Sequence, residues 1–324
     1  MEGALYVFCS TLVIIIHIFF MDTNSCVVRW ASDIEFTGRI PDFIGNWTQL
    51  ESFYVNFYVI FKVNVRFEGN SFEGPIPLSF SRLTSLQELV LRNNRISGPI
   101  PTNIGDYLYL ERLDLSFNNL NGQIPRGLFN LSRLSFLFLG NNSLNGTLPD
   151  VKSATLRNIN LIVNNFSLGD SGNSGLPSGL ECLQRNFPCA RGSPRYSDFG
   201  INCGGPPYTS SNRLLHAQET EDLGEATYYV NSERRWGVSN VGQRQNSKST
   251  VSSSLQFTNA SDSELFQTAR ISAGSLRYYG LGLQNGNYTV TLQFAELEIE
   301  NGRTWKSTGR RVLDIYLQVC ITIN

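Results

Sequence analysis

The sequence predicts two domains, an α/β solenoid followed by an all-β sandwich. The first observation behind this prediction is a repeat, because the dipeptides that close each unit recur every 24 residues: Ile76-Pro77, Ile100-Pro101, Ile124-Pro125 and Leu148-Pro149. The second is the run Tyr288–Phe294, in which apolar and polar residues alternate as they do in a half-buried strand. The third is the length of 324 residues, which is enough for two domains.

Each repeat has the core Leu-x-x-Leu-x-Leu-x-x-Asn, and copies begin at Leu86, Leu110 and Leu134. Alternate leucines of a short strand point into the core, and the asparagine side chain is expected to satisfy backbone groups of its own and the adjacent coil. A glycine and the closing proline then set the outer turn. This pattern is the leucine-rich repeat, which we assign to residues 28–168. Because one repeat cannot bury its apolar face alone, neighbouring repeats must stack.

The period breaks once inside the repeats. Pro41 and Pro77 lie 36 residues apart, which is one repeat plus twelve residues, and deleting residues 54–65 restores the pattern. These residues are therefore treated as an anomalous insert. One interpretation is a loop that contacts a ligand. The favoured one is retained non-coding sequence, because most of the residue types in the insert come from AT-rich codons.

The composition limits the possible functions. A net charge of -1 gives no electrostatic reason to expect nucleic-acid binding. Two histidines and six scattered cysteines leave little for a metal site, and the chain has no Gly-rich phosphate loop. We therefore expect no cofactor and no metal.

Sequons of the form Asn-x-Ser/Thr indicate the compartment, because seven of them, spread over both halves, favour a secreted and glycosylated surface. They begin at Asn46, Asn130, Asn141, Asn145, Asn165, Asn259 and Asn287. Residues 1–25 contain the apolar run Ala4–Phe20 and therefore predict a signal peptide, although no Lys or Arg precedes the run. The alternative interpretation is that these residues are misassigned sequence. No later segment has the roughly 18 apolar residues needed to cross a membrane.

Residues 169–198 are interpreted as the cap of the last repeat and a linker. Cys182 and Cys189 lie seven residues apart, and in a secreted chain this pair predicts a small disulfide that closes the end of the solenoid. The partner of Cys203 stays open.

The sequence after residue 196 has the alternation and turns of an antiparallel β domain. The turn Gln284–Asn287 precedes the strand predicted over Tyr288–Phe294, and a bulge near Ala295 would explain why the apolar positions then change parity. A further alternating strand is predicted from Leu313, Ile315 and Leu317. Together these segments predict a β-sandwich.

Five motifs in this region resemble the malectin domain of plant receptor-like kinases. They are Ile201–Gly205, Arg235–Asn240, Leu276–Leu283, Tyr288–Glu296 and Arg311–Tyr316. The resemblance implies a leucine-rich-repeat α/β solenoid followed by an all-β malectin-type sandwich over residues 199–318. After Gln318 the family pattern would continue with further strands, but residues 319–324 diverge from it, so we expect the sandwich to be truncated and incomplete.

Binding, rather than catalysis, is the predicted activity of the chain itself, and no catalytic residue is assigned. Glu296, Glu298 and Glu300 are spaced to lie side by side on one strand face, which does not suit a pair of catalytic acids across a cleft. On the concave face of the solenoid we expect a mixed aromatic and basic surface of the kind found at interface hot spots. Its candidate ligand-binding residues are Arg92, Arg112, Asp114, Phe117, Phe136 and Phe138. The alternative is that these side chains only cover the sheet.

The resemblance also implies a sugar-binding pair, Tyr278 and Tyr279, since the animal malectin that names the domain uses an aromatic pair for sugar stacking. Adjacent residues on a strand point in opposite directions, however, so one of the two is expected in the core.

Relatives with this domain order continue into one membrane helix and a cytoplasmic serine/threonine kinase. The resemblance therefore implies a ligand- or partner-binding ectodomain of a plant plasma-membrane receptor-like kinase, on the extracellular side. Its partners would be a peptide, a glycan or a co-receptor protein, and its membrane association would come only from the downstream helix. The alternative is a soluble secreted binder, acting as a decoy or as an inhibitor of cell-wall-degrading enzymes.

Overall fold

The computed structural model describes residues 28–30, 35–49, 63–148, 153–167, 178–185, 189, 195–221, 223, 227–241, 249–254, 261–272, 275–284, 286–295, 297 and 315. The chain falls into two compact units that do not follow chain order. The first unit comprises residues 1–197, 223–247 and 272–285, and the second comprises residues 198–222, 248–271 and 286–324. Segments of the predicted sandwich region therefore lie in both units.

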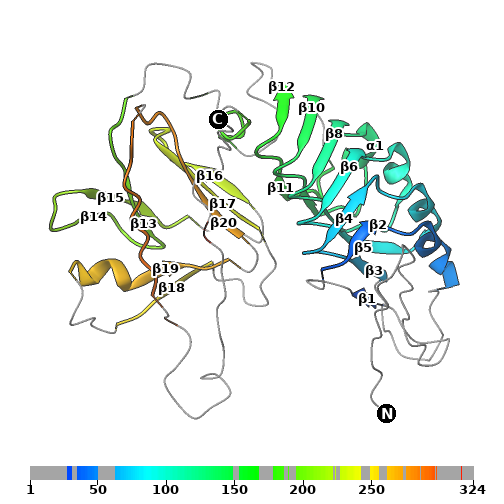
Figure 1. The fold of residues 1–324 in the computed structure, drawn as a ribbon, viewed down its shortest axis with the longest axis horizontal. Coiled ribbons are helices and arrows are strands. Elements are labelled where there is room, and N and C mark those ends of the chain that lie inside the picture. Colours follow the sequence, from blue (N-terminus) through cyan, green and yellow to red (C-terminus); the bar gives the residue numbers. More distant parts are fainter. Residues whose placement is uncertain are drawn as a thin grey trace, which may run out of the picture. The chain divides into compact units, whose positions relative to one another are not determined.

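The repeats form a solenoid in the first unit, in which each coil adds one strand to a parallel sheet (Figure 1). This first sheet has the order β1-β3-β5-β7-β9-β11. Its strands are β1 (Val28–Trp30), β3 (Val63–Arg66), β5 (Leu86–Val90), β7 (Arg112–Asp114), β9 (Phe136–Phe138) and β11 (Asn158–Asn160). Leu89, Leu113 and Leu137 lie side by side in register and are fully buried, which confirms the leucine pattern predicted from the sequence.

The end of the predicted insert takes part in the first sheet. Its last three residues, 63–65, belong to β3, where Val65 lies opposite Leu89 and is fully buried. Val65 supplies the inward-facing side chain at the position expected for Phe53. Residues 50–62 lie outside the described residues.

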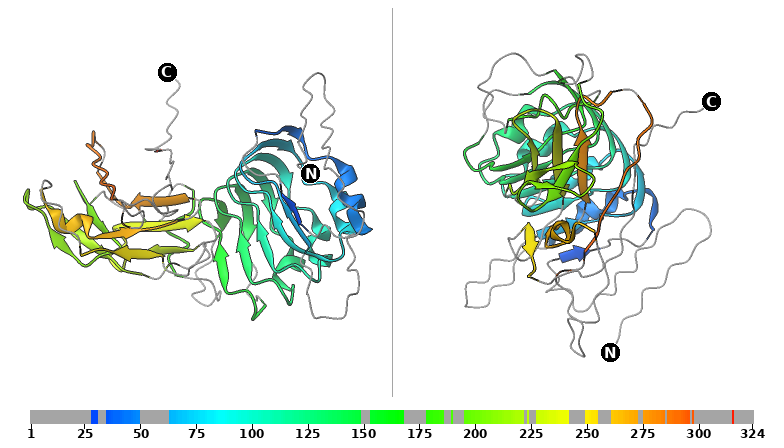
Figure 2. Two further views of the ribbon diagram at one scale, coloured as in Figure 1. Left: turned by 90° about the horizontal axis from the view of Figure 1, so that it is seen from below. Right: turned by 90° about the vertical axis from the view of Figure 1, so that its left-hand side faces the viewer.

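A second parallel sheet runs along the solenoid where the sequence predicts only an outer turn (Figure 2). Its order is β12-β10-β8-β6-β4-β2. Its strands are β2 (Thr37–Arg39), β4 (Ser71–Gly74), β6 (Arg95–Pro99), β8 (Asn119–Gln123), β10 (Ser143–Thr147) and β12 (Asn165–Ser167). Gly98, Gly122 and Gly146 in these strands have φ values of 84°, 75° and 85°, so the expectation that the glycine permits positive φ is confirmed. We refer to the exposed surface of these strands as the flank sheet.

Within the described ranges, short helical turns complete four of the coils. They are η1 (Asp42–Gln49), η2 (Leu78–Arg82), η3 (Thr102–Asp106) and α1 (Arg126–Phe129). The inward-facing side chains Phe80, Ile104 and Leu128 are at most 1% exposed, so these turns close the core on the side opposite the first sheet.

The repeat asparagines link consecutive coils, as predicted. The Asn118 side chain accepts a hydrogen bond from the Ile96 N–H at 3.0 Å and donates to the Leu91 carbonyl of the preceding coil at 2.9 Å. It also donates to the Leu115 carbonyl of its own coil at 3.1 Å. Buried backbone groups at the turn are thereby satisfied without water.

Residues from the predicted sandwich region close the C-terminal end of the solenoid. Within the first unit, β16 (Tyr228–Val230), β17 (Trp236–Val241) and β20 (Ser275–Gly280) form an antiparallel sheet with the order β16-β17-β20. From the last strand of the first sheet, Asn160 donates hydrogen bonds to the Ser239 hydroxyl at 3.2 Å and to the Thr227 carbonyl at 3.5 Å. We call this arrangement the closing sheet.

The described part of the second unit contains two small sheets. They comprise β13 (Gly200–Cys203), β15 (Leu215–Glu219) and β14 (Tyr208–Thr209) in one, and β18 (Thr250–Ser252) and β19 (Thr268–Arg270) in the other; η5 (Ser263–Phe266) precedes β19. The sequence predicts antiparallel pairing, but β13 and β15 are parallel. A fully buried ion pair between Glu219 and Arg270 joins the two sheets, with Arg270 Nε 3.0 Å from Glu219 Oε2.

The strand predicted over Tyr288–Phe294 is not formed, and this expectation was wrong. Residues 286–295 make no strand pairing among the described residues, and Val290 and Phe294 are 52% and 60% exposed. An alternating sequence needs a hydrogen-bonded neighbour and a covered face before it becomes a strand, and the described part supplies neither. The predicted bulge near Ala295 therefore has no strand to interrupt. Leu313 and Leu317 lie outside the described residues.

Candidate ligand-binding face

The concave face of the solenoid consists of the side chains of the first sheet that point away from the core, and these side chains form two rows across the strands. The first row is Asn64, Glu88, Arg112, Phe136 and Asn158; the second is Arg66, Val90, Asp114, Phe138 and Asn160. The rows arise because the same position of every repeat lies beside its neighbour in register. Four of the six predicted ligand-binding residues, Arg112, Asp114, Phe136 and Phe138, lie in the strands of this face, and Arg92 lies two residues after the end of β5.

Acidic and basic side chains alternate on the part of the face nearer the N-terminus. Arg66 binds Glu88 with a 2.8 Å contact, and Arg92 binds Glu68 with a 3.0 Å contact. The side chains of these four residues are between 13% and 22% exposed, so the charges are neutralised in pairs but remain accessible. Partly exposed ion pairs contribute only about 0–1 kcal/mol each, so they can exchange partners at little cost.

Asp114 differs from the other acids because it is buried. Its Oδ1 accepts a 2.6 Å hydrogen bond from the Ser116 hydroxyl, and Arg92 lies 4.0 Å from its Oδ2. Burial raises the pKa of Asp114 above its ordinary value of 3.8, and the arginines and the Ser116 bonds oppose this only in part. Asp114 is only 3% exposed and lies beside Arg92, so in this structure it supports Arg92 from below.

The Asp114 carboxyl gives a prediction about pH. Because the folded-state pKa of Asp114 is raised, the charged form of this carboxyl lowers the free energy of unfolding. The loss is absent below about pH 3.8, where the carboxyl is protonated in both states, and it grows as the pH rises through the folded-state pKa. Asp114→Asn removes the titration, so the free energy of unfolding of the variant relative to the parent should increase between about pH 4 and pH 7. Urea unfolding at a series of pH values measures it. Asp106→Asn, at an exposed site, is the control; an Asp114→Asn difference that stays flat or falls contradicts the assignment.

Arg112 and Phe136 form the aromatic and basic part of the face. They are neighbours in the first row, and the Arg112 guanidinium lies 4.2 Å from the centre of the Phe136 ring and 5.7 Å from that of Phe138. Phe136 is half-buried, whereas Arg112 and Phe138 are only 6% and 1% exposed. The expectation that Phe138 is exposed was therefore wrong, because the side chain is fully packed. Arg112 and Phe138 hold the accessible Phe136 ring in place.

Phe117 lies outside the two rows of the concave face. It has φ 56°, in the left-handed region where the corresponding residues of two neighbouring coils are Asn93 and Asn141. Asparagine tolerates this conformation, whereas a bulky residue rarely adopts it. The Phe117 ring is half-buried beneath the Arg277 guanidinium of the closing sheet, at 4.1 Å, and Arg277 also donates to Asn141 Oδ1 at 3.3 Å. Phe117 therefore anchors the closing sheet to the solenoid, and it is not an open ligand contact.

Tyr278 and Tyr279 do not form one aromatic surface. They are consecutive residues of β20, opposite Val238 and Gly237, so their rings lie on opposite faces of the closing sheet. Tyr279 packs against the hydrophobic core of the solenoid, and its burial raises the pKa of its hydroxyl. The hydroxyl oxygens of both tyrosines are buried. Stacking of one sugar across the pair, as the resemblance implies, is therefore not supported by this arrangement.

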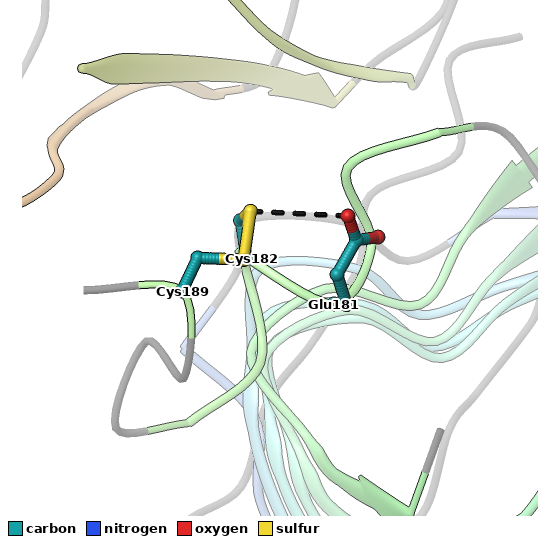
Figure 3. A group of neighbouring side chains, drawn as sticks. All are labelled: Glu181, Cys182 and Cys189. Atoms are coloured by element: carbon teal, nitrogen blue, oxygen red, sulfur yellow. Dashed lines mark hydrogen bonds between the residues drawn. A yellow bond between two sulfur atoms is a disulfide. The ribbon is translucent and has the colours of Figure 1, made fainter. Parts of the chain in front are cut away.

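Glu181, Cys182 and Cys189 gather at the end of the solenoid (Figure 3). Cys182 and Cys189 are joined in a disulfide, so their sulfur atoms are not available as thiolate ligands for a metal ion. Glu181 lies 3.3 Å from Arg234 Nη2, which neutralises its charge. This cluster is structural, and it fastens the cap of the last coil. Glu296, Glu298 and Glu300 lie outside the described residues.

The predicted glycosylation sites have different surroundings. Asn130, Asn145, Asn165 and Asn287 are exposed, and Asn141 is half-buried. The side chain of Asn46 and the whole of Asn259 lie outside what the structure describes.

Comparisons with known proteins agree with this architecture. The Malectin domain family matches residues 197–324, and the Leucine Rich Repeat family matches residues 85–107 and 109–131. No kinase domain is found alongside them. The chain therefore carries one segment similar to the Leucine Rich Repeat and one similar to the Malectin domain.

About half of the chain is similar to plant LRR receptor-like serine/threonine kinases. Two probable kinases of this kind from Arabidopsis thaliana, At1g56140 and At1g56130, are 54% and 53% identical to it over 166 and 165 residues. These matches cover 50% and 49% of this chain but only 16% of each relative, so the chain spans about one sixth of their length.

A solved structure of the LRR ectodomain of the Arabidopsis thaliana receptor kinase GASSHO1/SCHENGEN3, in complex with CASPARIAN STRIP INTEGRITY FACTOR 2, is also similar. It is 38% identical, with a TM-score of 0.33, and the match covers 41% of this chain and 15% of that one. In the described part of this chain, no helix combines the length and apolarity that crossing a bilayer requires.

Proposed function

We propose that this chain is the ligand- or partner-binding ectodomain of a receptor-like serine/threonine kinase, on the extracellular side of the plasma membrane. The observation that supports this most directly is the concave face, where an accessible Phe136 is held by Arg112 and Phe138 beside exchangeable ion pairs. Its relationship to plant receptor kinases points the same way. In this proposal the chain binds but does not phosphorylate.

The chemistry of the face favours a peptide or a co-receptor protein over a neutral glycan. A partner that presents both a carboxylate and a cation can pair with Arg66 and with Glu68, whose charges are partly accessible on this face. Phe136 would supply the apolar contact at the centre of the interface, where aromatic residues contribute most. A neutral sugar would leave the ion pairs as they are, and it would gain only the aromatic contact.

Phe136→Ser is expected to weaken binding at least about tenfold, which corresponds to about 1.4 kcal/mol. The measurement is biolayer interferometry of the secreted chain against a panel of extracellular peptides and cell-wall oligosaccharides. The matched control is Leu78→Ser, because Leu78 is 68% exposed on η2, away from the first sheet. Equal affinity of parent and Phe136→Ser for every ligand that binds would remove the concave face from the proposal.

The mature messenger RNA provides a separate test of the proposal that the chain is a receptor ectodomain. Long-read sequencing of the mature transcript across the codons for residues 53–66 and 318–324 is expected to show messages that continue into a membrane helix and a kinase domain. Messages that keep residues 54–65 and stop after Asn324 would instead support a soluble secreted binder, which could act as a decoy or as an inhibitor of cell-wall-degrading enzymes.

A further inference from the structure

The flank sheet presents an uncharged polar surface at its C-terminal end. The side chains that point outward from β8, β10 and β12 are asparagine, glutamine, serine and threonine, and most of them are exposed. The same side of β2, β4 and β6 carries the exposed charged residues Arg39, Glu73 and Arg95. A flat uncharged region is therefore confined to the last three coils.

Two sequons lie directly opposite each other in this region. Asn145 of β10 pairs in register with Asn165 of β12, and the hydroxyl residues of their sequons, Thr147 and Ser167, pair in the same way. All four side chains are exposed. No described residue hydrogen-bonds the side-chain amide of Asn145 or Asn165, while their backbones belong to the sheet. An attached sugar would extend into solvent without disturbing a native contact.

Asn141, only four residues before Asn145, has the opposite environment. It is half-buried with φ 59°, and its side-chain oxygen accepts the hydrogen bond from Arg277. Asn141 and Arg277 also line a small cavity together with Phe117. A sugar on Asn141 would occupy the place of Arg277 and displace the closing sheet from the end of the solenoid.

We infer that Asn145 and Asn165 on the flank sheet are N-glycosylated, and that Asn141 is unmodified in the folded protein. The inference rests on the extracellular location proposed above. The donor is an oligosaccharide linked to a polyprenyl pyrophosphate. The Nδ2 atom of asparagine forms a bond to the anomeric carbon of the first sugar, the bond from that carbon to the pyrophosphate oxygen breaks, and the amide loses one proton as the lipid pyrophosphate leaves.

This arrangement assigns different roles to the two sheets of the solenoid. Glycans would shield the flank sheet of the last coils, and the first sheet would stay open around Phe136. A chain modified at Asn141 before folding could not form the Arg277 contact, so it should be retained in the cell and not secreted.

The test removes each sequon without touching its asparagine. The full chain is expressed behind an added secretion signal in insect cells, and the secreted protein is compared on gels before and after peptide N-glycosidase. Thr147→Ala and Ser167→Ala are each expected to increase the mobility by one glycan, whereas Ser143→Ala, which removes the Asn141 sequon, leaves the mobility unchanged. A shift for Ser143→Ala, or no shift for either of the other variants, overturns the inference.

If a variant is not secreted, the parent protein decides the question. Peptide N-glycosidase digestion in heavy-oxygen water, followed by mass spectrometry, should label Asn145 and Asn165 and leave Asn141 unlabelled. Label at Asn141, or none at Asn145 or Asn165, contradicts the inference. Because the host supplies the secretory pathway, this result is independent of whether the concave face binds a ligand.

Discussion

Replacement of Asn142 by leucine is expected to lower the free energy of unfolding of the first unit by about 3–5 kcal/mol. Asn142 is fully buried, accepts a hydrogen bond from the Leu120 N–H at 3.0 Å, and donates to the carbonyls of Leu115 and Leu139, also at 3.0 Å. Leucine fills a similar volume but provides no hydrogen bond, so the Leu120 N–H loses its acceptor inside the core. Urea unfolding followed by circular dichroism measures the change.

The matched control for this prediction is Asn121→Leu. Asn121 is an exposed asparagine of the flank sheet, so the same change of chemistry there should alter the free energy of unfolding by no more than about 0.5 kcal/mol. If Asn142→Leu also stays within about 1 kcal/mol of the parent, the coils are held together mainly by their leucines, and the asparagine ladder is secondary.

Arg270→Met is expected to destabilise the second unit by about 3–5 kcal/mol, because it leaves the carboxylate of Glu219 buried without its cation. The Arg270 side chain also donates to the Ser249 hydroxyl at 2.9 Å and to the Glu221 carbonyl at 2.7 Å, so one side chain joins β19 to β15 and to the loops beside them. Hydrogen exchange of the β15 amides in the full chain reports this loss locally, since opening of the second unit exposes them.

A double variant distinguishes the effect of the buried Glu219 charge from the loss of the other contacts of Arg270. Glu219→Leu combined with Arg270→Met removes both buried charges, and it should recover about 1–4 kcal/mol relative to Arg270→Met alone. If the double variant exchanges as fast as the single one, the hydrogen bonds of Arg270 to Ser249 and Glu221 outweigh the ion pair. Arg213→Met, at an exposed site in the same unit, should leave the exchange of β15 unchanged.

The parts of the fold that follow from local sequence were predictable. The burial of Leu113, the hydrogen bonds of Asn118 and the positive φ of Gly122 depend on one repeat and its neighbour, and the period of 24 residues reports both. The flank sheet was missed because its strands form only when the outer turns of adjacent coils align. The strand predicted over Tyr288–Phe294 was wrong because alternation indicates only that a segment can form a strand. It does not show that a neighbouring strand is present to pair with it.

The candidate site was predicted only in part. The period places Arg112, Phe136 and Phe138 on one face, but it does not say which of them stays accessible. Phe117 is covered by Arg277, which also donates a hydrogen bond to Asn141. Arg277 lies 136 positions after Asn141 in the sequence, and no repeat pattern reveals a contact between residues so far apart. The one local signal was the phenylalanine itself, at a position where the neighbouring coils have asparagine with a left-handed backbone.

The closing sheet also determines how such a protein can change in length over evolution. Asn160 and Asn141 are tied to Ser239 and Arg277, so the last coils are specialised for one fixed junction. Each coil before them contacts mainly its two neighbours, and duplication or deletion of a whole 24-residue unit there would leave that junction intact. Gene rearrangement can therefore lengthen or shorten the solenoid at a distance from the junction, and we expect the last coils to vary less in number and sequence than the others.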